Sequence, residues 1–124
     1  MQKFPRTDTR QTGRHHETLA LAYLEKAGLR LIQRNFNCRL GEIDLIMHDR
    51  DQLVFVEVRY RRQEQRGSGI ESVTPGKQRK IIRAAKLYLL SKGLYERISC
   101  RFDVVGLRGD MQNPEFHWLK NAFV

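Results

Sequence analysis

Apolar residues recur at two different spacings along the chain, and the segment around residues 12–27 shows the helical spacing. Its apolar stripe repeats every three or four positions and consists of Ala20, Tyr23, Leu24 and Ala27. Thr12 is of a residue type that caps helix starts, and Gly28 suits the left-handed conformation that often follows a helix. The pattern therefore predicts a helix with one face packed against the rest of the domain.

A second helical pattern begins at Thr74 and Pro75, where the threonine is placed to cap the helix and the proline to occupy its first position. Gly93 is expected to end this helix. The predicted buried face consists of Ile81, Ala84, Ala85, Tyr88 and Leu89.

The remaining apolar residues alternate with polar ones or form short runs, which is typical of β-strands. The expected strands span residues 29–36, 41–48, 52–59, 101–107 and 116–119. Turns are expected at 37–40 and 109–114, and a long loop at 60–73. The order αβββαββ predicts an α/β domain with a mixed β-sheet flanked by helices.

The second and third strands are expected to form a hairpin, because each has an aliphatic face that can be buried. These faces consist of Ile43, Leu45 and Met47 on one strand and Val54, Val56 and Val58 on the other. Two registers satisfy this burial: a turn at 50–51 places Asp44 opposite Glu57, and a turn at 49–50 places Glu42 opposite Glu57. In both, two carboxylates face each other with Cβ atoms about 5 Å apart, where like charges destabilise the pair.

Such a pair needs a compensating positive charge. Mg²⁺ can supply it, since this ion binds one or two carboxylates and completes its shell with water and phosphate oxygens. Arg59, on the same face as Glu57, can supply it instead as a structural ion pair. For an isolated acidic pair the ion pair is the commoner arrangement. Here the basic surroundings, which suit phosphates, favour a metal.

The composition of the chain indicates a class of partner. Lys and Arg number 23 against 14 Asp and Glu in 124 residues, which gives a formal charge of +9 and a pI near 10.1. A positive excess of this size on one small domain favours polyanionic partners such as nucleic acid.

Three basic segments are candidates for contact with such a partner. Directly after the hairpin, residues 59–66 carry a net charge of +3 from Glu64 and the four arginines Arg59, Arg61, Arg62 and Arg66. Lys77 and Gln78 lie in the first turn of the second helix, whose free N–H groups suit an anion. A stripe farther along that helix consists of Arg79, Arg83 and Lys86.

Other polar residues are expected to have structural roles. Asp103 shares a strand face with Arg101, so an ion pair is expected there. His15 and His16 precede Glu17, but adjacent residues point in different directions on a helix and no His or Cys partner lies at zinc spacing.

No apolar stretch approaches the ~18–20 residues of a membrane span, and the first eleven residues lack the apolar core of a signal peptide. A cytoplasmic protein without a membrane partner is therefore expected. Cys38 and Cys100 lie far apart and are expected to be reduced and partly buried. Residues 1–12 are expected to form a mobile tail, and residues 13–124 a single domain.

Several segments together resemble the YraN-type family of small bacterial proteins, which are predicted endonucleases related to Holliday-junction resolvases. The resemblance covers about residues 13–123 and is carried by the segments GEIDLI (41–46), VFVEVRYR (54–61), KQ (77–78), RFDVV (101–105) and NAF (121–123). It implies a restriction-endonuclease-like fold with a site of the D…ExK type.

The resemblance also implies roles for individual residues. Asp44 and Glu57 would be metal ligands, Glu17 a further acidic ligand, and Arg59 would stand where the motif usually has lysine. Mg²⁺ or Mn²⁺ held there would polarise a phosphate and lower the pKa of a bound water. Asp44, Glu57 and Arg59 are thus the catalytic residues implied. Arg59 can stabilise phosphate charge but cannot transfer a proton, because its pKa is above 12.

The predicted function is therefore a metal-dependent endonuclease that acts on DNA rather than RNA, including branched or structured DNA. By analogy with resolvases, which act as dimers on symmetric junctions, a homodimer is implied. The alternative, which Arg59 favours, is a catalytically weak or inactive DNA- or RNA-binding accessory module. A structural RNA-associated protein would explain the charge but leaves the facing carboxylates without a role.

Overall fold

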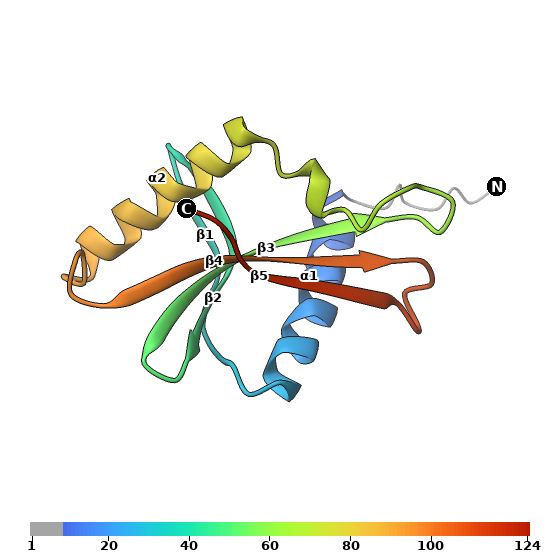
Figure 1. Cartoon of the computed structure of the whole chain (residues 1–124), viewed down its shortest axis with the longest axis horizontal. Helices are drawn as coiled ribbons and strands as arrows, with labels where there is room; N and C mark the ends of the chain where they lie inside the picture. The colour runs from blue at the N-terminus through green and yellow to red at the C-terminus, as the bar shows by residue number, and fades with distance from the viewer. Residues whose placement is uncertain (1–8) are drawn as a thin grey trace.

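The computed structural model describes residues 9–124, with side chains from residue 13 onward (Figure 1). The predicted order αβββαββ is confirmed, with one short 3₁₀ turn added before the second helix. Of the predicted N-terminal tail, residues 1–8 lie outside the described residues, and residues 9–12 belong to the first helix.

The five strands form one sheet in the order β1-β2-β3-β4-β5. β3 and β4 run parallel and are joined through α2, whereas the other neighbouring pairs are antiparallel. The helical elements are α1 (Thr9–Lys26), η1 (Ile70–Ser72) and α2 (Pro75–Ser91). The strands are β1 (Arg30–Cys38), β2 (Gly41–Asp49), β3 (Gln52–Arg61), β4 (Ser99–Arg108) and β5 (Glu115–Phe123).

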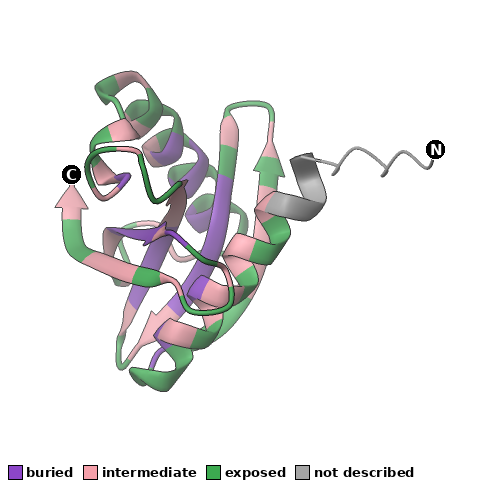
Figure 2. Cartoon of the chain, turned by 90° about the vertical axis from the view of Figure 1, so that its right-hand side faces the viewer, coloured by how far each residue is buried: buried purple, intermediate pink, exposed green. Residues whose placement is uncertain are grey.

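The sheet is covered on both faces, α2 packing on one and α1 on the other (Figure 2). The α2 cluster is centred on Phe55, and the α1 cluster includes Leu45. A mixed sheet between helices with this element order is consistent with a restriction-endonuclease-like fold.

The second helix forms as its sequence predicts. Thr74 caps it by accepting a hydrogen bond from the Lys77 backbone N–H at 3.3 Å, and Pro75 is its first residue. The five predicted core positions are all buried. The helix ends at Ser91, and Gly93 adopts a φ of 70° beyond it.

The first helix begins three residues earlier than predicted and ends one residue sooner, at Lys26. It begins at Thr9 rather than being capped at Thr12, because no proline or glycine interrupts residues 9–12. Gly28 ends it as predicted, with a φ of 105°. Ala27 follows the last helical residue and is exposed, so it does not belong to the buried stripe.

The hairpin adopts the first of the two predicted registers. Asp49 pairs with Gln52 and the ladder continues to Leu45 opposite Val56, so one further step brings Asp44 beside Glu57. The predicted face of Ile43 is wrong: this side chain packs in the α2 cluster with Ile46, whereas Leu45 and Met47 lie in the α1 cluster. The β2–β3 pairing ends at Leu45, and the simple alternation of faces does not continue beyond it.

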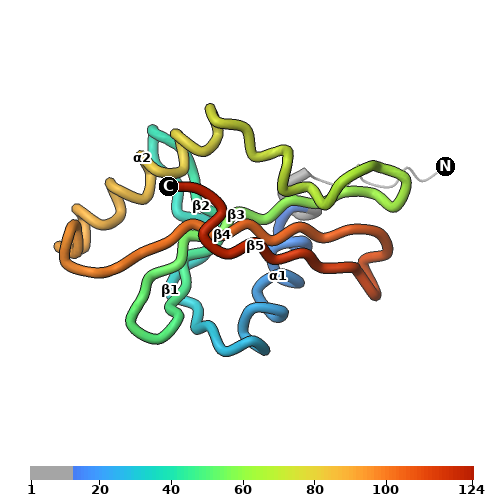
Figure 3. The backbone as a smooth tube through the Cα atoms, viewed as in Figure 1, coloured from blue at the N-terminus to red at the C-terminus, as the bar shows by residue number. Residues whose placement is uncertain are grey.

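Residues 60–73 are more ordered than a long loop. β3 continues to Arg61, and η1 ends the segment. Between them, the Arg108 guanidinium donates to the backbone carbonyls of Gly67 and Gln63 at 3.1 and 3.0 Å. Gly106 allows this close packing, since a Cβ there would overlap the carbonyl of Ser68. Figure 3 shows the segment beside the β4–β5 end of the sheet.

The remaining strand boundaries shift outward: β1 continues to Cys38 and β5 to Phe123, both beyond the predicted ends. Cys38 and Cys100 are unpaired and half-buried, as predicted. The helices of residues 9–124 include none that is long and apolar enough to cross a membrane.

Candidate functional site

A cleft of about 780 Å³ opens where β2 and β3 separate beyond the last pair of their ladder. In Figure 1 the β1–β2 turn rises beside α2, while β3 runs toward the segment before η1. α1 contributes one wall and the first turns of α2 the other. The polar side chains most relevant to its chemistry are Glu17, Asp44, Glu57, Arg59, Lys77 and Lys80.

Asp44 lies at the point of separation and is only 8% exposed. Its Oδ2 accepts a hydrogen bond from the backbone N–H of Val58 at 2.8 Å, so the side chain takes a donor that β3 would otherwise offer to a neighbouring strand. Burial, and secondly the charge of Glu57, raises the pKa of Asp44 to about 8. The carboxyl group of Asp44 therefore holds a proton at neutral pH when no cation is bound beside it.

Glu57 faces Asp44 from β3 and shares its burial. Burial raises the pKa of Glu57, while the Arg59 guanidinium, whose Nη1 lies 3.2 Å from Glu57 Oε2, opposes this rise. Arg59 is itself held by its Nε, which donates to Ser72 Oγ at 2.8 Å. The arginine that replaces the lysine of the motif is thus tied to a carboxylate and to η1.

Glu17 reaches the same cleft from α1, as the resemblance implied. Its side chain is 12% exposed, and its Oε1 has no hydrogen-bond partner among the described residues. Arg34 is 3.9 Å away. Burial, followed by the charge of Asp44, raises the pKa of Glu17 to about 7. Three acidic side chains from three elements therefore influence one another here.

The carboxylates of the cleft are suited to a divalent metal ion as a facing pair. Within residues 13–124, no group of three or more His, Cys, Asp or Glu side chains is arranged to hold a metal. Asp44 and Glu57 nevertheless offer two facing carboxylates, and Glu17 Oε1 is an oxygen without a donor. Mg²⁺ requires only one or two carboxylates, with water or phosphate completing its shell. The residues fit such an ion, with Asp44 and Glu57 as the two principal ligands.

The wall opposite α1 is basic. Lys77 lines it, as the sequence indicated, and Arg39 and Lys80, which the sequence analysis missed, line it too. A Cβ at Gly41 would lie 3.0 Å from the Lys80 carbonyl oxygen, so the β1–β2 turn approaches α2 closely there. The signal for Lys80 was its spacing of three from Lys77 on one helix face.

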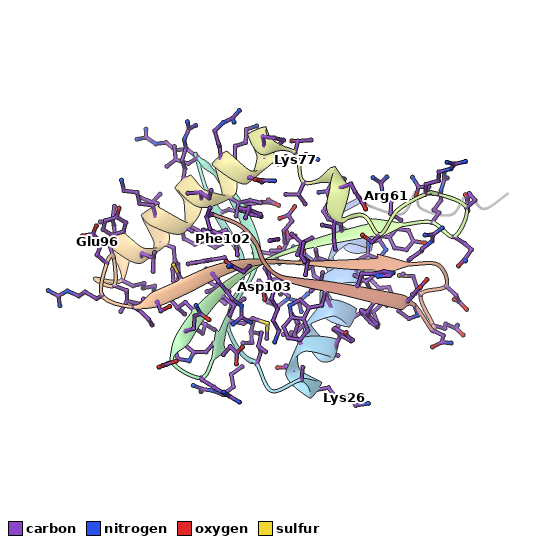
Figure 4. All side chains as sticks on the ribbon, viewed as in Figure 1. Lys26, Arg61, Lys77, Glu96, Phe102 and Asp103 are labelled. Carbon is purple, nitrogen blue, oxygen red and sulfur yellow. The ribbon has the colours of Figure 1, made fainter. Side chains whose placement is uncertain are left out.

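The other predicted nucleic-acid contacts do not line the cleft. Gln78 donates through Nε2 to the backbone carbonyl of Val73 at 3.0 Å. Arg62 is exposed and pairs with Glu64 at 3.0 Å. Figure 4 shows Lys77 at the start of α2 and Arg61 at the end of β3. Arg61, Arg66, Arg79 and Arg83 likewise lie outside the cleft lining.

His16 also lines the cleft, although sequence reasoning gave it no site role. Its ring stacks on that of Tyr60, with centroids 4.3 Å apart and planes inclined by 15°. Burial, and then the nearby His15, lowers the pKa of His16. No local pattern predicts this contact, because Tyr60 is distant in sequence and approaches only through the packing of α1 on β3.

The profile of the Uncharacterised protein family UPF0102 matches residues 16–107. This range contains the implied site residues Glu17, Asp44, Glu57 and Arg59. The chain belongs to UPF0102. This is the family of YraN-type proteins, so the resemblance seen in the sequence is confirmed.

Individual UPF0102 proteins are similar to this chain over nearly its whole length. One from Nitrosococcus oceani is 52% identical over 114 residues, which are 92% of each chain. One from Stutzerimonas stutzeri is 47% identical over 117 residues, 94% of this chain and 98% of its own. A third, from Colwellia psychrerythraea, is 48% identical over 118 residues, 94% and 92% of the two chains.

Proposed function

We propose that this UPF0102 protein is a divalent-metal-dependent endonuclease that hydrolyses phosphodiester bonds in DNA. The observation that carries the proposal is the facing pair of Asp44, which is buried, and Glu57, whose side chain is 13% exposed, in a cleft with a basic wall. In a protein with a charge of +9, a buried pair of carboxylates is consistent with a site for a cation that bridges protein and phosphate.

Each cleft residue then has a chemical role. Asp44 and Glu57 would hold Mg²⁺ or Mn²⁺, and Glu17 would serve beside them as a hydrogen-bond acceptor or a further ligand. When bound, the ion supplies Lewis acidity at a phosphate oxygen and lowers the pKa of a coordinated water. Lys77 and Lys80 contact the phosphates on either side of the scissile bond.

Arg59 stabilises negative charge on the phosphate under attack. Its Nη1 lies 3.2 Å from Glu57 Oε2 and its side chain is 27% exposed, so it could exchange this contact for a phosphate once a cation lay beside Glu57. It does not move a proton, because its pKa stays far above neutral pH. The proton of the attacking water would pass to solvent or to Glu17 as its oxygen bonds to phosphorus. The P–O bond to the leaving strand breaks, and the leaving oxygen takes a proton from solvent; without a lysine to donate that proton, turnover is expected to be slow.

A second candidate is a DNA-binding accessory module without turnover. The Arg59–Glu57 ion pair favours it, because it already compensates one of the two carboxylates without a metal. In this case the basic wall would bind nucleic acid, and the carboxylates would be a structural remnant.

The deciding experiment incubates the protein with supercoiled plasmid and with branched DNA in Mg²⁺ or Mn²⁺. Asp44→Asn and Glu57→Gln are expected to abolish cleavage, while Asp51→Asn, at an exposed carboxylate in the hairpin turn, leaves it intact. Calorimetric titration is expected to show metal binding that both site variants lose. Cleavage that persists in Glu57→Gln would assign the activity to a contaminant, and absence of both cleavage and metal binding would leave the accessory module.

We also propose that the protein acts in the cytoplasm as a homodimer, since symmetric branched DNA offers two equivalent strands to two copies. Light scattering on the protein with and without a four-way junction tests this. A single copy per junction would contradict it.

A further inference from the structure

The aromatic pair of His16 and Tyr60 borders the carboxylates at the α1 wall. His16 precedes Glu17 on α1, and both line the same cleft as Asp44 and Glu57. His16 lines the cleft, whereas Tyr60 is not among the described residues that do. Tyr60 therefore lies behind His16, and His16 is the member of the stack that reaches the cleft.

Both rings are held by the fold. Tyr60 lies on the central strand β3, pairs with Leu107 of β4, and donates its hydroxyl to the Gly109 carbonyl at 2.9 Å. His16 lies one helical turn before Ala20, which is fully buried. A partner that stacks on His16 would not have to order either ring, which reduces the entropic cost of binding.

His16 continues the packing of α1 on Tyr60 of β3 out to the rim of the cleft. Ala20 and Leu24 are fully buried and already anchor the helix. His16 is only partly buried and lies at the rim of the cleft. Proteins stack unpaired nucleic-acid bases on accessible aromatic side chains, histidine included.

We propose that His16, backed by Tyr60, is the stacking platform for an unpaired base of the strand whose phosphodiester lies at Asp44 and Glu57. A base inside an intact duplex has both faces covered by its neighbours, so only an unpaired or extruded base can occupy this platform. The inference rests on the proposed function for its nucleic-acid partner and narrows the substrate class. The preferred substrates carry unpaired nucleotides: single strands, gaps, flaps or open junctions.

Binding in EDTA tests this without cleavage. Fluorescence anisotropy compares a labelled single strand with a fully paired duplex for wild type, His16→Ala, His16→Phe and His15→Ala. His16→Ala is expected to weaken single-strand binding roughly 5- to 100-fold and to leave duplex binding unchanged, since stacking on an aromatic ring contributes this much per base. His16→Phe restores the affinity. His15→Ala, the exposed neighbouring histidine, matches wild type.

A spectroscopic measurement separates stacking from general destabilisation. A single strand that contains 2-aminopurine is expected to lose fluorescence in the complex with wild type and with His16→Phe, and to lose less of it with His16→Ala. Thermal unfolding checks that all variants are folded. Equal losses of single-strand and duplex affinity in His16→Ala, or quenching unchanged by it, would overturn the proposal.

The two proposals can fail separately. If Asp44→Asn binds single strands with quenching that requires His16 while wild type cleaves nothing in Mg²⁺, the platform stands and the endonuclease proposal fails. If wild type cleaves duplex plasmid as well as single strands and His16→Ala does the same, the endonuclease stands and the platform fails.

Discussion

Asp103 and Asp44 are buried aspartates in the same sheet. Asp103 is surrounded by hydrogen-bond donors, whereas Asp44 lies beside other carboxyl groups. Asp103 is fully buried on β4 and accepts hydrogen bonds from Arg101 Nε at 3.0 and 3.2 Å, from Trp118 Nε1 at 2.9 Å and from the Asn121 backbone N–H at 2.9 Å. The ion pair predicted from the sequence is therefore confirmed. Figure 4 shows Asp103 in the middle of the sheet.

Within the described part of the chain, Asp44 has one donor, the Val58 N–H, and its other neighbours include the carboxyl groups of Glu57 and Glu17. The fold thus has the means to satisfy a buried aspartate and uses them at one position only. A buried carboxylate whose oxygens all accept hydrogen bonds stabilises the structure. Buried carboxylates with few hydrogen-bond donors are suited to binding a cation. The difference separates a structural cluster from a candidate site in one molecule.

The largest expected effect on stability is at Asp103 and the donors that surround it. Asp103→Ala removes the acceptor for Arg101, Trp118 and Asn121 at once and leaves buried donors unpaired. The free energy of unfolding is expected to fall by about 3–5 kcal/mol. Urea unfolding measures it, with Asp51→Asn as an exposed control expected to stay within about 0.5 kcal/mol of wild type. A loss below about 1 kcal/mol would contradict the structural assignment.

At Asp44, which has few donors, removing the charge is expected to raise the free energy of unfolding. The pKa of Asp44 is raised from 3.8 to about 8, so the native state holds a proton that the unfolded state has lost between these values. Stability without metal therefore falls as the pH rises from about 4 to 8. Asp44→Asn removes this penalty, and at pH 8 the variant is expected to be about 2–3 kcal/mol more stable than wild type. At pH 4 the two should coincide, and unfolding curves that differ equally at both pH values would refute the account.

Added metal should also reverse the loss of stability caused by ionised Asp44, because the ion neutralises its charge. A fixed Mg²⁺ concentration, ten times the dissociation constant at pH 8, is expected to stabilise the wild type by about 1.4 kcal/mol at that pH. The effect should grow from pH 6 to 8, because the ion displaces the proton on Asp44. Thermal unfolding with and without Mg²⁺ measures it. Asp44→Asn should not respond, while Asp51→Asn should; equal responses would place the ion elsewhere.

The smallest expected effect concerns the basic wall. Lys80→Ala should reduce the slope of log affinity for DNA against log salt by about 1, since one phosphate contact is lost. Lys26→Ala, at the distant end of α1, is the matched control and should keep the wild-type slope (Figure 4). Equal slopes for wild type and Lys80→Ala in a salt titration would exclude this wall from the interface.

Local patterns were enough to predict much of the molecule. The cap at Thr74, the stop at Gly93 and the buried face of α2 follow from residues within one helix. Alternation in the hairpin limited Asp44 and Glu57 to two registers, and the structure adopts one of them. The partnership of Asp103 and Arg101 could be inferred because two residues on one strand face are neighbours in any fold that keeps the strand.

Only the tertiary structure decided what surrounds the carboxylates. β2 and β3 separate beyond Leu45, Ile43 packs against the α2 side, and Glu17, His16 and Lys80 arrive from two helices on opposite faces of the sheet. No spacing in the sequence encodes these contacts, because they depend on the packing angles of whole helices. The sequence by itself determined the order of the elements and limited the facing acidic pair to two registers, since both depend on backbone periodicity. The burial that raises the pKa of Asp44 and the basic and aromatic walls of the cleft depended on how distant segments pack.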